Sequence, residues 1–191
     1  MTLEERVVLL EEDGSPRGVA PKAGVHHADT PLHLAFSCHV LDDAGRILLT
    51  RRALGKATWP GTWTNAVCGH PEPFEPIPDA VHRRVGQELG LALRDLRLVL
   101  PDFRYRAVDA SGVVENEVCP VYTAVAVGGI RADPRETMEH RWVQPEDLAA
   151  ALTAAPWAFS PWLVLQAEQM SALHDDVPGG AIRAEAWRDA A

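Results

Sequence analysis

Alternating apolar and polar positions predict strands in the first part of the chain. The apolar residues 7–10 are followed by the turn-forming stretch EEDGSPRG and a short apolar return, which predicts a strand, a turn and a second short strand. The longer run LHLAFSCHVL alternates apolar with polar residues, and the turn DDAGR joins it to ILLTRR. Residues 32–52 are therefore predicted to form a hairpin, and the following WPGTW a loop.

A helix is predicted over residues 78–90. The stretch PDAVHRRVGQELG begins with proline and ends with glycine, the residues that favour the start and the end of a helix. Val81, Val85 and Leu89 recur every four residues and therefore share one apolar face. Arg84 and Glu88 lie together on a neighbouring stripe of the same helix.

Beyond this helix the pattern predicts further strands and then helices. The runs LRLVLPDFRYRAV and GVVENEVCPVYTAVAV predict two strands around the turn DASG. HRWV predicts a short strand, PEDLAAAL a short helix, and SPWLVLQAEQMSAL the last helix. This order predicts an α/β or α+β sandwich with a mixed sheet. A single domain is expected over residues 1–175, and residues 176–191, rich in Pro, Gly and Ala, are expected to form a mobile tail.

The composition narrows the class of protein. The chain has 191 residues, of which 47% are hydrophobic and 24% charged, as is typical of a globular protein with one sizeable core. A formal net charge of -9 argues against nucleic-acid binding, and an anionic ligand would need local cations or metal ions. The acidic N-terminal stretch does not resemble a signal peptide, and the apolar runs are too short to span a bilayer. Three cysteines without a CxxC pair favour a reducing, cytoplasmic setting.

Carboxylates and histidines form a first candidate site. Glu115 and Glu117 are two residues apart in a predicted strand, so both point to one face, about 7 Å apart along it. Either this face is exposed to solvent, or something positive lies between the two charges. His26, His27 and His33 lie close together in the sequence and His70 follows Cys68 and Gly69, and three imidazoles together with two carboxylates would suit an octahedral site for a divalent ion. A zinc site built from the scattered cysteines is less favoured.

Cys68 is a second candidate. The stretch WTNAVCGHPEPFE places it in a predicted loop beside Gly69 and His70, where nearby positive charge would favour its thiolate. Free cysteine is, however, also common as a small buried apolar residue, so a reactive and a structural role both stay open at this point. Cys38 and Cys119, in predicted strands, are assigned the structural role.

A spaced set of residues resembles the Nudix box, G-x5-E-x7-R-E-U-x-E-E-x-G-U. The matching positions are Gly69, Glu75, Arg83, Val85, Glu88, Gly90 and Leu91. This resemblance implies an α/β/α sandwich that handles diphosphates with divalent metals. Two carboxylates of the box are replaced here, by Arg84 and Gln87. Because Nudix hydrolases use those carboxylates to hold metal and activate water, their loss weakens the expectation of a hydrolase.

Most of the chain resembles one branch of that superfamily, the type I isopentenyl-diphosphate Δ-isomerase family. The resemblance covers roughly residues 7–173 and rests on HADTPLHLAFS, LLTRRALGKATWPGTWTNAVCGHP, AVHRRVGQELG, LPDFRYRAVDASGVVENEVCPV and PWAFSPW. It implies conversion of isopentenyl to dimethylallyl diphosphate through protonation of the alkene, a tertiary carbocation and loss of a proton from the neighbouring carbon. Cys68 and Glu117 match the catalytic pair, Tyr105 the phenol that assists protonation. Trp162 matches the ring that stabilises the cation.

The same resemblance implies metal ions and phosphate-binding cations. His26, His33, His70, Glu115 and Glu117 would hold one divalent ion, Mn²⁺, Mg²⁺ or Zn²⁺, with His27 as an alternative to His26. A second ion, Mg²⁺, would join the diphosphate to Glu88 and the carbonyl of Cys68. The positions that match phosphate-binding residues are Lys22, Arg52 and Lys56, and Arg83 is a further candidate for binding the substrate. Arg83 would equally serve as a structural partner within the box. A small prenyl diphosphate as substrate, and a monomer or weak homodimer, are expected.

Two other functions stay open on the sequence. The first is a Nudix hydrolase acting on a nucleoside or prenyl diphosphate, in which Cys68, Tyr105 and Glu117 would be superfluous. The second is a catalytically silent metal-binding or ligand-binding module, which would leave an acid–base pair under an aromatic cap without a purpose.

Overall fold

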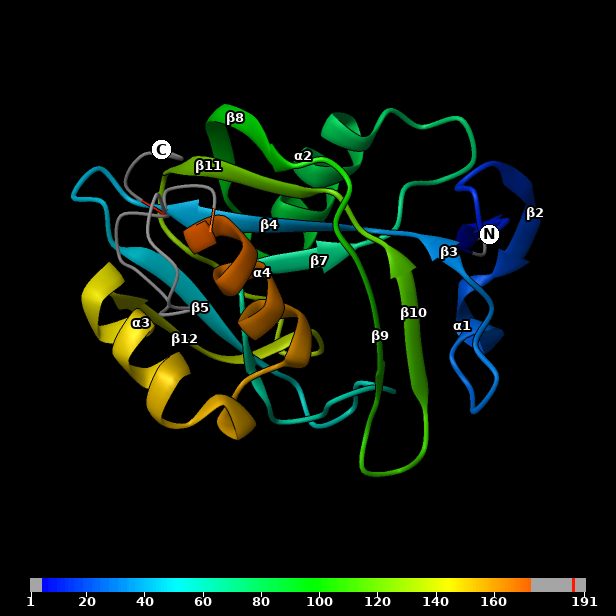
Figure 1. Cartoon of the computed structure of the whole chain (residues 1–191). Coiled ribbons are helices and arrows are strands. Elements are labelled where there is room, and N and C mark those ends of the chain that lie inside the picture. Colours follow the sequence, from blue (N-terminus) through cyan, green and yellow to red (C-terminus); the bar gives the residue numbers. More distant parts are fainter. Residues whose placement is uncertain (1–4, 173–186, 188–191) are drawn as a thin grey trace.

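Two β-sheets and four α-helices make up the part of the chain that the structure describes. The structure, a computed structural model, describes residues 5–172 and Trp187 (Figure 1). The strands are β1 Arg6–Leu10, β2 Pro16–Pro21, β3 His33–Leu34, β4 Phe36–Leu41, β5 Ile47–Arg52, β6 Trp63–Thr64, β7 Val67–Gly69, β8 Ala92–Leu100, β9 Arg104–Val108, β10 Val114–Val118, β11 Val121–Val127 and β12 Thr137–Val143. The helices are α1 Lys22–Val25, α2 Ile77–Leu89, α3 Pro145–Ala154 and α4 Pro161–Ala172, with a 3-10 turn at Pro156–Ala158.

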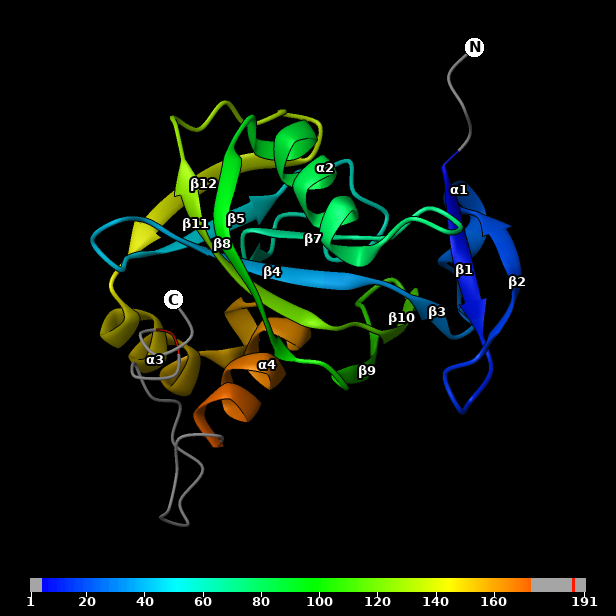
Figure 2. The same cartoon turned by 90° about the horizontal axis from the view of Figure 1, so that it is seen from above.

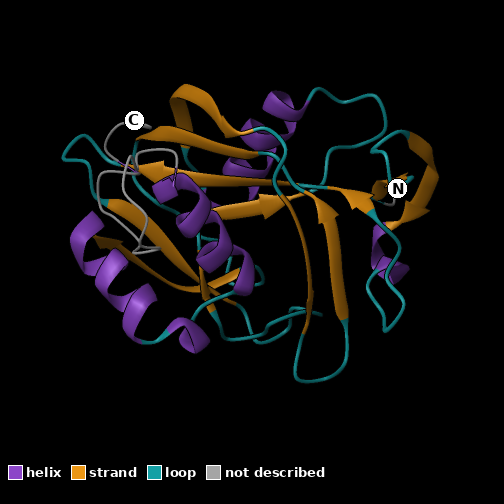
Figure 3. Ribbon diagram, viewed as in Figure 1, coloured by secondary structure: helices purple, strands orange, loops and turns teal. Residues whose placement is uncertain are grey.

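The larger sheet, in the order β12-β5-β4-β11-β8, is the middle layer of an α/β/α sandwich. Helix α2 covers one face, and α3 and α4 cover the other (Figures 2 and 3). Alternate residues of β5 point to the two faces: Ile47 and Leu49 pack in the cluster that contains α3 and α4, and Leu48 in the cluster that contains α2. β4 and β11 run parallel and the other neighbours antiparallel, so the sheet is mixed. The predicted fold class is confirmed.

Each of the two longest predicted strands is in fact two strands. Residues 96–108 divide near Pro101 into β8 of the larger sheet and β9 of the smaller sheet, whose order is β2-β1-β3-β10-β9. Residues 112–127 divide at Pro120 into β10 and β11 in the same way. Proline has no N–H to donate to a strand ladder, which favours a break at these positions. Together with the step from β3 to β4, the described chain therefore crosses three times between the two sheets.

The predicted hairpin over residues 32–52 is confirmed at its turn, since β4 and β5 are antiparallel neighbours in the sheet. They pair only at Leu41 and Ile47, because β7 pairs with the rest of that edge of β4, and β6 with the rest of that edge of β5. Strand β6 lies at the end of the stretch predicted as a loop. Strand β7 places Cys68 opposite Ser37, so Cys68 lies on a strand and not in the predicted loop.

The central helix begins and ends close to its predicted bounds. α2 has proline in its first turn, and Gly90 follows it in the left-handed conformation with φ 64°. The N–H of Gly90 donates to the carbonyl of Gly86 at 3.1 Å. The predicted apolar face is buried, and the polar stripe next to it is buried as well, since Arg84 is 4% exposed. Burial of an arginine requires partners, which lie in the candidate site described below.

The ends of the chain add two features. The short helix α1 was not predicted, and it carries Lys22 at its start. The predicted tail, residues 176–191, lies outside the described residues except for Trp187, which is buried and packs edge to face on His39 with ring centroids 6.3 Å apart. Across the described residues, the helices are too short or too polar to cross a membrane.

Candidate active site

A cavity of about 460 Å³ opens where residues of both sheets and of α4 meet. Ten of the residues predicted for the site line it: Lys22, His26, Arg52, Lys56, Cys68, His70, Tyr105, Glu115, Glu117 and Trp162. His33, Arg83 and Glu88 do not line this cavity. Among the ten are the candidate acid–base residues, an aromatic ring and three cations, so one cavity combines the chemical groups that the sequence had left scattered.

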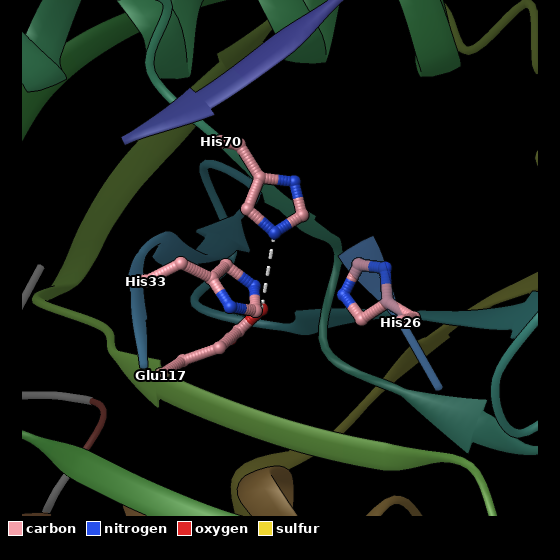
Figure 4. Close-up of side chains that lie close together, drawn as sticks. All are labelled: His26, His33, His70 and Glu117. Carbon is pink, nitrogen blue, oxygen red and sulfur yellow. Dashed lines mark hydrogen bonds and ion pairs between the residues drawn. The ribbon is translucent and has the colours of Figure 1, made fainter. Parts of the chain in front are cut away.

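Three histidines and a glutamate converge at one end of this cavity (Figure 4). One ligand atom from each of His26, His33, His70 and Glu117 lies within 4.8 Å of all the others. Glu117 Oε1 lies 3.2 Å from His70 Nε2 and 3.4 Å from His33 Nε2. His33 and Glu117 are register partners in the parallel pairing of β3 with β10, which fixes their approach.

Glu115 joins this cluster through His26. Its Oε2 lies 3.0 Å from His26 Nε2, and its Oε1 accepts a hydrogen bond of 2.6 Å from the Thr58 hydroxyl. Both glutamates are 5% exposed, so the alternative of a solvent-exposed strand face is wrong. His27 is exposed, and its Nδ1 accepts from the backbone of Asp29, so His26 is the residue of the two that faces the cluster.

The cluster fits a divalent metal ion. Among the described residues, the buried His26 Nε2, His33 Nε2 and Glu115 Oε2 have no hydrogen-bond partner. His33 Nδ1 lies 2.9 Å from the Pro31 carbonyl, which can only accept, so the proton is on Nδ1 and the lone pair of Nε2 faces the cluster. Imidazole nitrogens with carboxylate oxygens suit borderline and hard divalent ions. These residues can therefore hold such an ion.

Protonation in the cluster follows from burial and from the pairing of the histidines with Glu117. Burial lowers the pKa of His70 to about 4. Burial would also lower the pKa of His33, but pairing with the negative charge of Glu117 outweighs burial and raises that pKa. Burial would raise the pKa of Glu117, but its pairing with His33 and His70 outweighs burial and holds this pKa well below its ordinary value. Glu117 is therefore ionised at neutral pH.

Cys68 and Tyr105 supply the other proton-bearing groups of the cavity. Cys68 Sγ lies 3.2 Å from Ser37 Oγ and 3.3 Å from Asn65 Oδ1. Burial raises the pKa of Cys68 to about 11, so the expected thiolate is wrong and the thiol is protonated at neutral pH. The Tyr105 hydroxyl donates to Glu117 Oε2 at 2.9 Å, across the register pair of β9 and β10. Burial, with the charge of Glu117, raises the pKa of Tyr105 well above its ordinary value.

Aromatic rings cover the same cavity. Trp162, on α4, is 2% exposed, and its ring centroid lies 5.8 Å from that of Tyr105 and 5.4 Å from that of Trp59. The guanidinium carbon of Arg52 lies 5.3 Å from the Trp162 centroid. A buried indole surface at the wall excludes water and presents a π face to a cation.

Arg84 is a further cation of the cavity, which the sequence analysis did not assign to substrate. It lines the cavity with Lys22, Arg52, Lys56 and Arg135. It is paired with Glu88, and its Nη2 lies 3.4 Å from Glu136 Oε1. Gly69 makes room for it, because a Cβ there would come within 3.0 Å of Arg84 Cγ. The sequence signal for this residue was its position in the Nudix box: Arg84 directly follows the arginine of the box, where the box has glutamate.

Arg83, which was predicted as a phosphate ligand or as a structural partner, has structural contacts. Its Nε and Nη2 each donate to the Glu75 carboxylate at 2.7 Å, and Nη2 also donates to the His70 carbonyl at 3.2 Å. The bidentate pair ties the loop before α2 to the helix and fixes the backbone next to Cys68. The contacts favour the structural alternative for Arg83.

Glu88 lies behind the cavity wall. It lines a small pocket of about 20 Å³ together with Cys68, Arg52 and Lys56. Its carboxylate is paired with Arg84, and burial raises its pKa. An ion that joined Glu88 to the Cys68 carbonyl would therefore have to displace the Arg84 guanidinium from this carboxylate.

Fold and sequence together define the class of protein. The pattern of the NUDIX domain matches residues 31–163, so the chain is a member of the Nudix family. Two solved structures share the fold. DR0079 from Deinococcus radiodurans has a TM-score of 0.61 and 18% identity, and the match covers 78% of this chain and 90% of that chain. The MutT protein from Methanosarcina mazei Go1 has a TM-score of 0.60 and 17% identity, and the match covers 78% of this chain and 99% of that chain.

Curated relatives narrow the family. An isopentenyl-diphosphate Delta-isomerase from Clavibacter michiganensis subsp. michiganensis is 64% identical over 85% of this chain and 84% of its own. One of the same name from Leifsonia xyli subsp. xyli is 56% identical over 93% of this chain and 97% of its own. The chain belongs to the isopentenyl-diphosphate Delta-isomerase family within the Nudix fold.

Proposed function

We propose that this protein is an enzyme that interconverts isopentenyl diphosphate and dimethylallyl diphosphate. The observation that supports this most is the shared cavity, which is lined by a protonated thiol, Cys68, an ionised carboxylate, Glu117, and the ring of Trp162. One proton donor and one proton acceptor are what a double-bond shift requires, since it adds a proton to one carbon and removes one from another. The names of the curated relatives agree with this reaction.

The reaction has two proton transfers. The π electrons of the terminal alkene form a new C–H bond with a proton from the donor, which leaves a tertiary carbocation. The acceptor then removes a proton from the neighbouring CH₂ group, and the electrons of that C–H bond become the new double bond. Cys68 and Glu117 act as this pair, with Tyr105 hydrogen-bonded to Glu117, and they exchange roles when the reaction runs in reverse. Trp162 stabilises the cation by about 1–2 kcal/mol in a dry site and keeps water from it.

The basic side chains that line the cavity would bind the charged diphosphate end of the substrate. Lys22, Arg52, Lys56 and Arg84 line this cavity and would bind the diphosphate, which offsets the net charge of -9. His26, His33, His70, Glu115 and Glu117 would hold a divalent ion, Mn²⁺, Mg²⁺ or Zn²⁺, and Glu88 and the Cys68 carbonyl a Mg²⁺ that neutralises phosphate charge. Such ions, when bound, supply charge neutralisation and orientation of the anionic end. A cytoplasmic monomer or weak homodimer is proposed, in line with three free cysteines.

The proposed function is tested with isopentenyl diphosphate and Mg²⁺. We expect dimethylallyl diphosphate as the product, little released phosphate, and loss of turnover after treatment with a chelator, restored by added metal. Product analysis by NMR and a phosphate assay measure the two outcomes. A monophosphate or inorganic phosphate as the main product would favour the hydrolase that the Nudix fold also hosts. Absence of turnover with retained metal binding would favour the silent binding module.

Arg84 and Arg83 give a matched pair of variants for substrate binding. Arg84→Gln is expected to raise KM for isopentenyl diphosphate by about 10- to 150-fold, because a hydrogen bond to a charged group contributes about 1.5–3 kcal/mol. Arg83→Gln breaks the pair with Glu75 and is expected to lower the melting temperature while KM changes little. Steady-state kinetics and thermal unfolding measure both. The reverse pattern of KM values would assign diphosphate binding to Arg83.

A further inference from the structure

Asn65, between β6 and β7, is a fully buried side chain whose orientation is fixed by its partners. Its Nδ2 donates to the carbonyl oxygens of Cys38, at 3.2 Å, and Val67, at 3.0 Å, and these can only accept. The indole N–H of Trp162 can only donate, and it lies 3.0 Å from Oδ1. The amide therefore has one orientation, with its oxygen toward the cavity wall.

The oxygen of Asn65 is a shared acceptor for two groups of the proposed chemistry. It accepts from the Cys68 thiol at 3.3 Å and from Trp162 Nε1 at 3.0 Å. A third donor, the Thr64 hydroxyl at 3.0 Å, does not line the cavity and also lies 2.8 Å from Ser160 Oγ. Among the described residues, Asn65 is thus the one side chain that is hydrogen-bonded to both the thiol and the indole.

We propose that Asn65 is a positioning residue that holds the Cys68 thiol and the Trp162 ring in one fixed relation to each other, through a single amide oxygen. This rests on the proposed function and adds to it the residue that aligns a proton-handling group with the cation-stabilising ring. Asn65 transfers no proton itself. The hydrogen bond to its oxygen polarises the indole N–H bond and shifts electron density into the ring. This strengthens the attraction of the ring for a cation.

Fixed alignment matters because the carbocation exists only between the two proton transfers. A misplacement of reacting groups by about 1 Å can reduce the rate by about 10²-fold. Ser37 is the second contact of the thiol, and Gln166 Nε2 in turn donates to Ser37 Oγ at 2.8 Å, so the thiol is held from two sides by buried side chains. Loss of the Asn65 contact is therefore expected to affect the transition state more than the binding of substrate.

The test compares two ligands of one shape and different charge. One probe is 2-(dimethylamino)ethyl diphosphate, an ammonium with the shape of the tertiary cation, and the other is neutral-tailed 3-methylbutyl diphosphate. In Asn65→Ala we expect kcat to fall about 10- to 100-fold with KM within about threefold of the parent. Affinity for the ammonium probe, measured by calorimetry, is expected to fall at least about fivefold, and affinity for the neutral-tailed probe to stay unchanged. Thr64→Val, which removes the third donor to the same oxygen, is the matched control and is expected to leave kcat near the parental value.

A second variant, Trp162→Phe, keeps an aromatic ring but removes the indole N–H, and it leaves the bonds of Asn65 to the two carbonyls intact. When Asn65→Ala is added to Trp162→Phe, the ammonium affinity is expected to change less than it does when Asn65→Ala is made in the parent. A double-mutant cycle would then show coupling between the two residues. Equal losses for both probes, or additive effects in the cycle, would overturn the proposal. If the parent did not turn over isopentenyl diphosphate, the proposed function would fail, whereas the comparison of probes requires no turnover.

Discussion

Replacement of Cys68 by alanine is expected to lower kcat for isomerisation by about 10²- to 10⁴-fold, the contribution of a positioned acid or base. Alanine has no transferable proton, and the other cysteines cannot substitute, because neither Cys38 nor Cys119 lines the cavity. Conversion of isopentenyl diphosphate at saturating substrate measures kcat. The fold should persist, since the small side chain is half-buried and its hydrogen bonds are those with Ser37 and Asn65.

Cys38→Ala is the matched control for this variant. Cys38 is a buried cysteine on β4 that packs in the cluster on the α2 side of the sheet. Its loss is expected to reduce stability through a small void, with kcat near the parental value. Near-parental turnover by Cys68→Ala, with an intact fold by circular dichroism, would remove the thiol from the reaction.

Glu117→Gln is expected to have the other large effect. The amide has nearly the shape of the carboxylate, but at neutral pH it neither accepts nor donates the required proton, so kcat is expected to fall about 10²- to 10⁴-fold. The change also removes the negative charge that faces His33 and His70. Affinity for Mn²⁺ or Zn²⁺, measured by equilibrium dialysis, is therefore expected to fall at least about 10-fold.

Two measurements separate these roles of Glu117. If the residue transfers a proton, saturating metal will not restore turnover in the variant. In metal-free protein, the pKa of His33 is expected to fall, because bonding to Glu117 is what raises it in the parent; an NMR titration of the histidine ring follows this. Glu139→Gln, an acid on β12 paired with Arg51 and Arg141, is the control and should leave both properties unchanged. Full recovery of kcat at saturating metal would limit Glu117 to metal binding.

The Nudix box has a different use in this chain from the one in a hydrolase. Glu75 and Arg83 form a structural pair, Gly69 gives room to Arg84, and Gly90 ends the helix. Arg84 stands where a hydrolase has a carboxylate, and its pKa is raised, because its pairing with Glu88 and Glu136 outweighs the lowering by burial. A permanently charged guanidinium in this place favours an anionic substrate, and a Mg²⁺ at Glu88 would have to displace it.

Local features of this protein were determined by the sequence itself. Proline at the start, glycine at the end and a four-residue apolar period were enough to predict α2 within a residue of its bounds. The alternation of β10 placed Glu115 and Glu117 on one face, since strand side chains have a period of two. Family-specific motifs named the site residues in advance, and ten of them do line one cavity.

Other features were decided only by the tertiary structure. Adjacent residues on a helix point about 100° apart, so whether Arg83 or Arg84 faces the cavity depends on how α2 packs on the sheet. The pairing of β4 with β7 and β11, and not chiefly with β5, placed Cys68 on a strand beside Ser37. Asn65 has no sequence signal, because its importance lies in contacts with Cys68 and with Trp162, a residue 97 positions along the chain. Contacts between distant segments depend on packing and on crossings between sheets, which no local pattern of residues encodes.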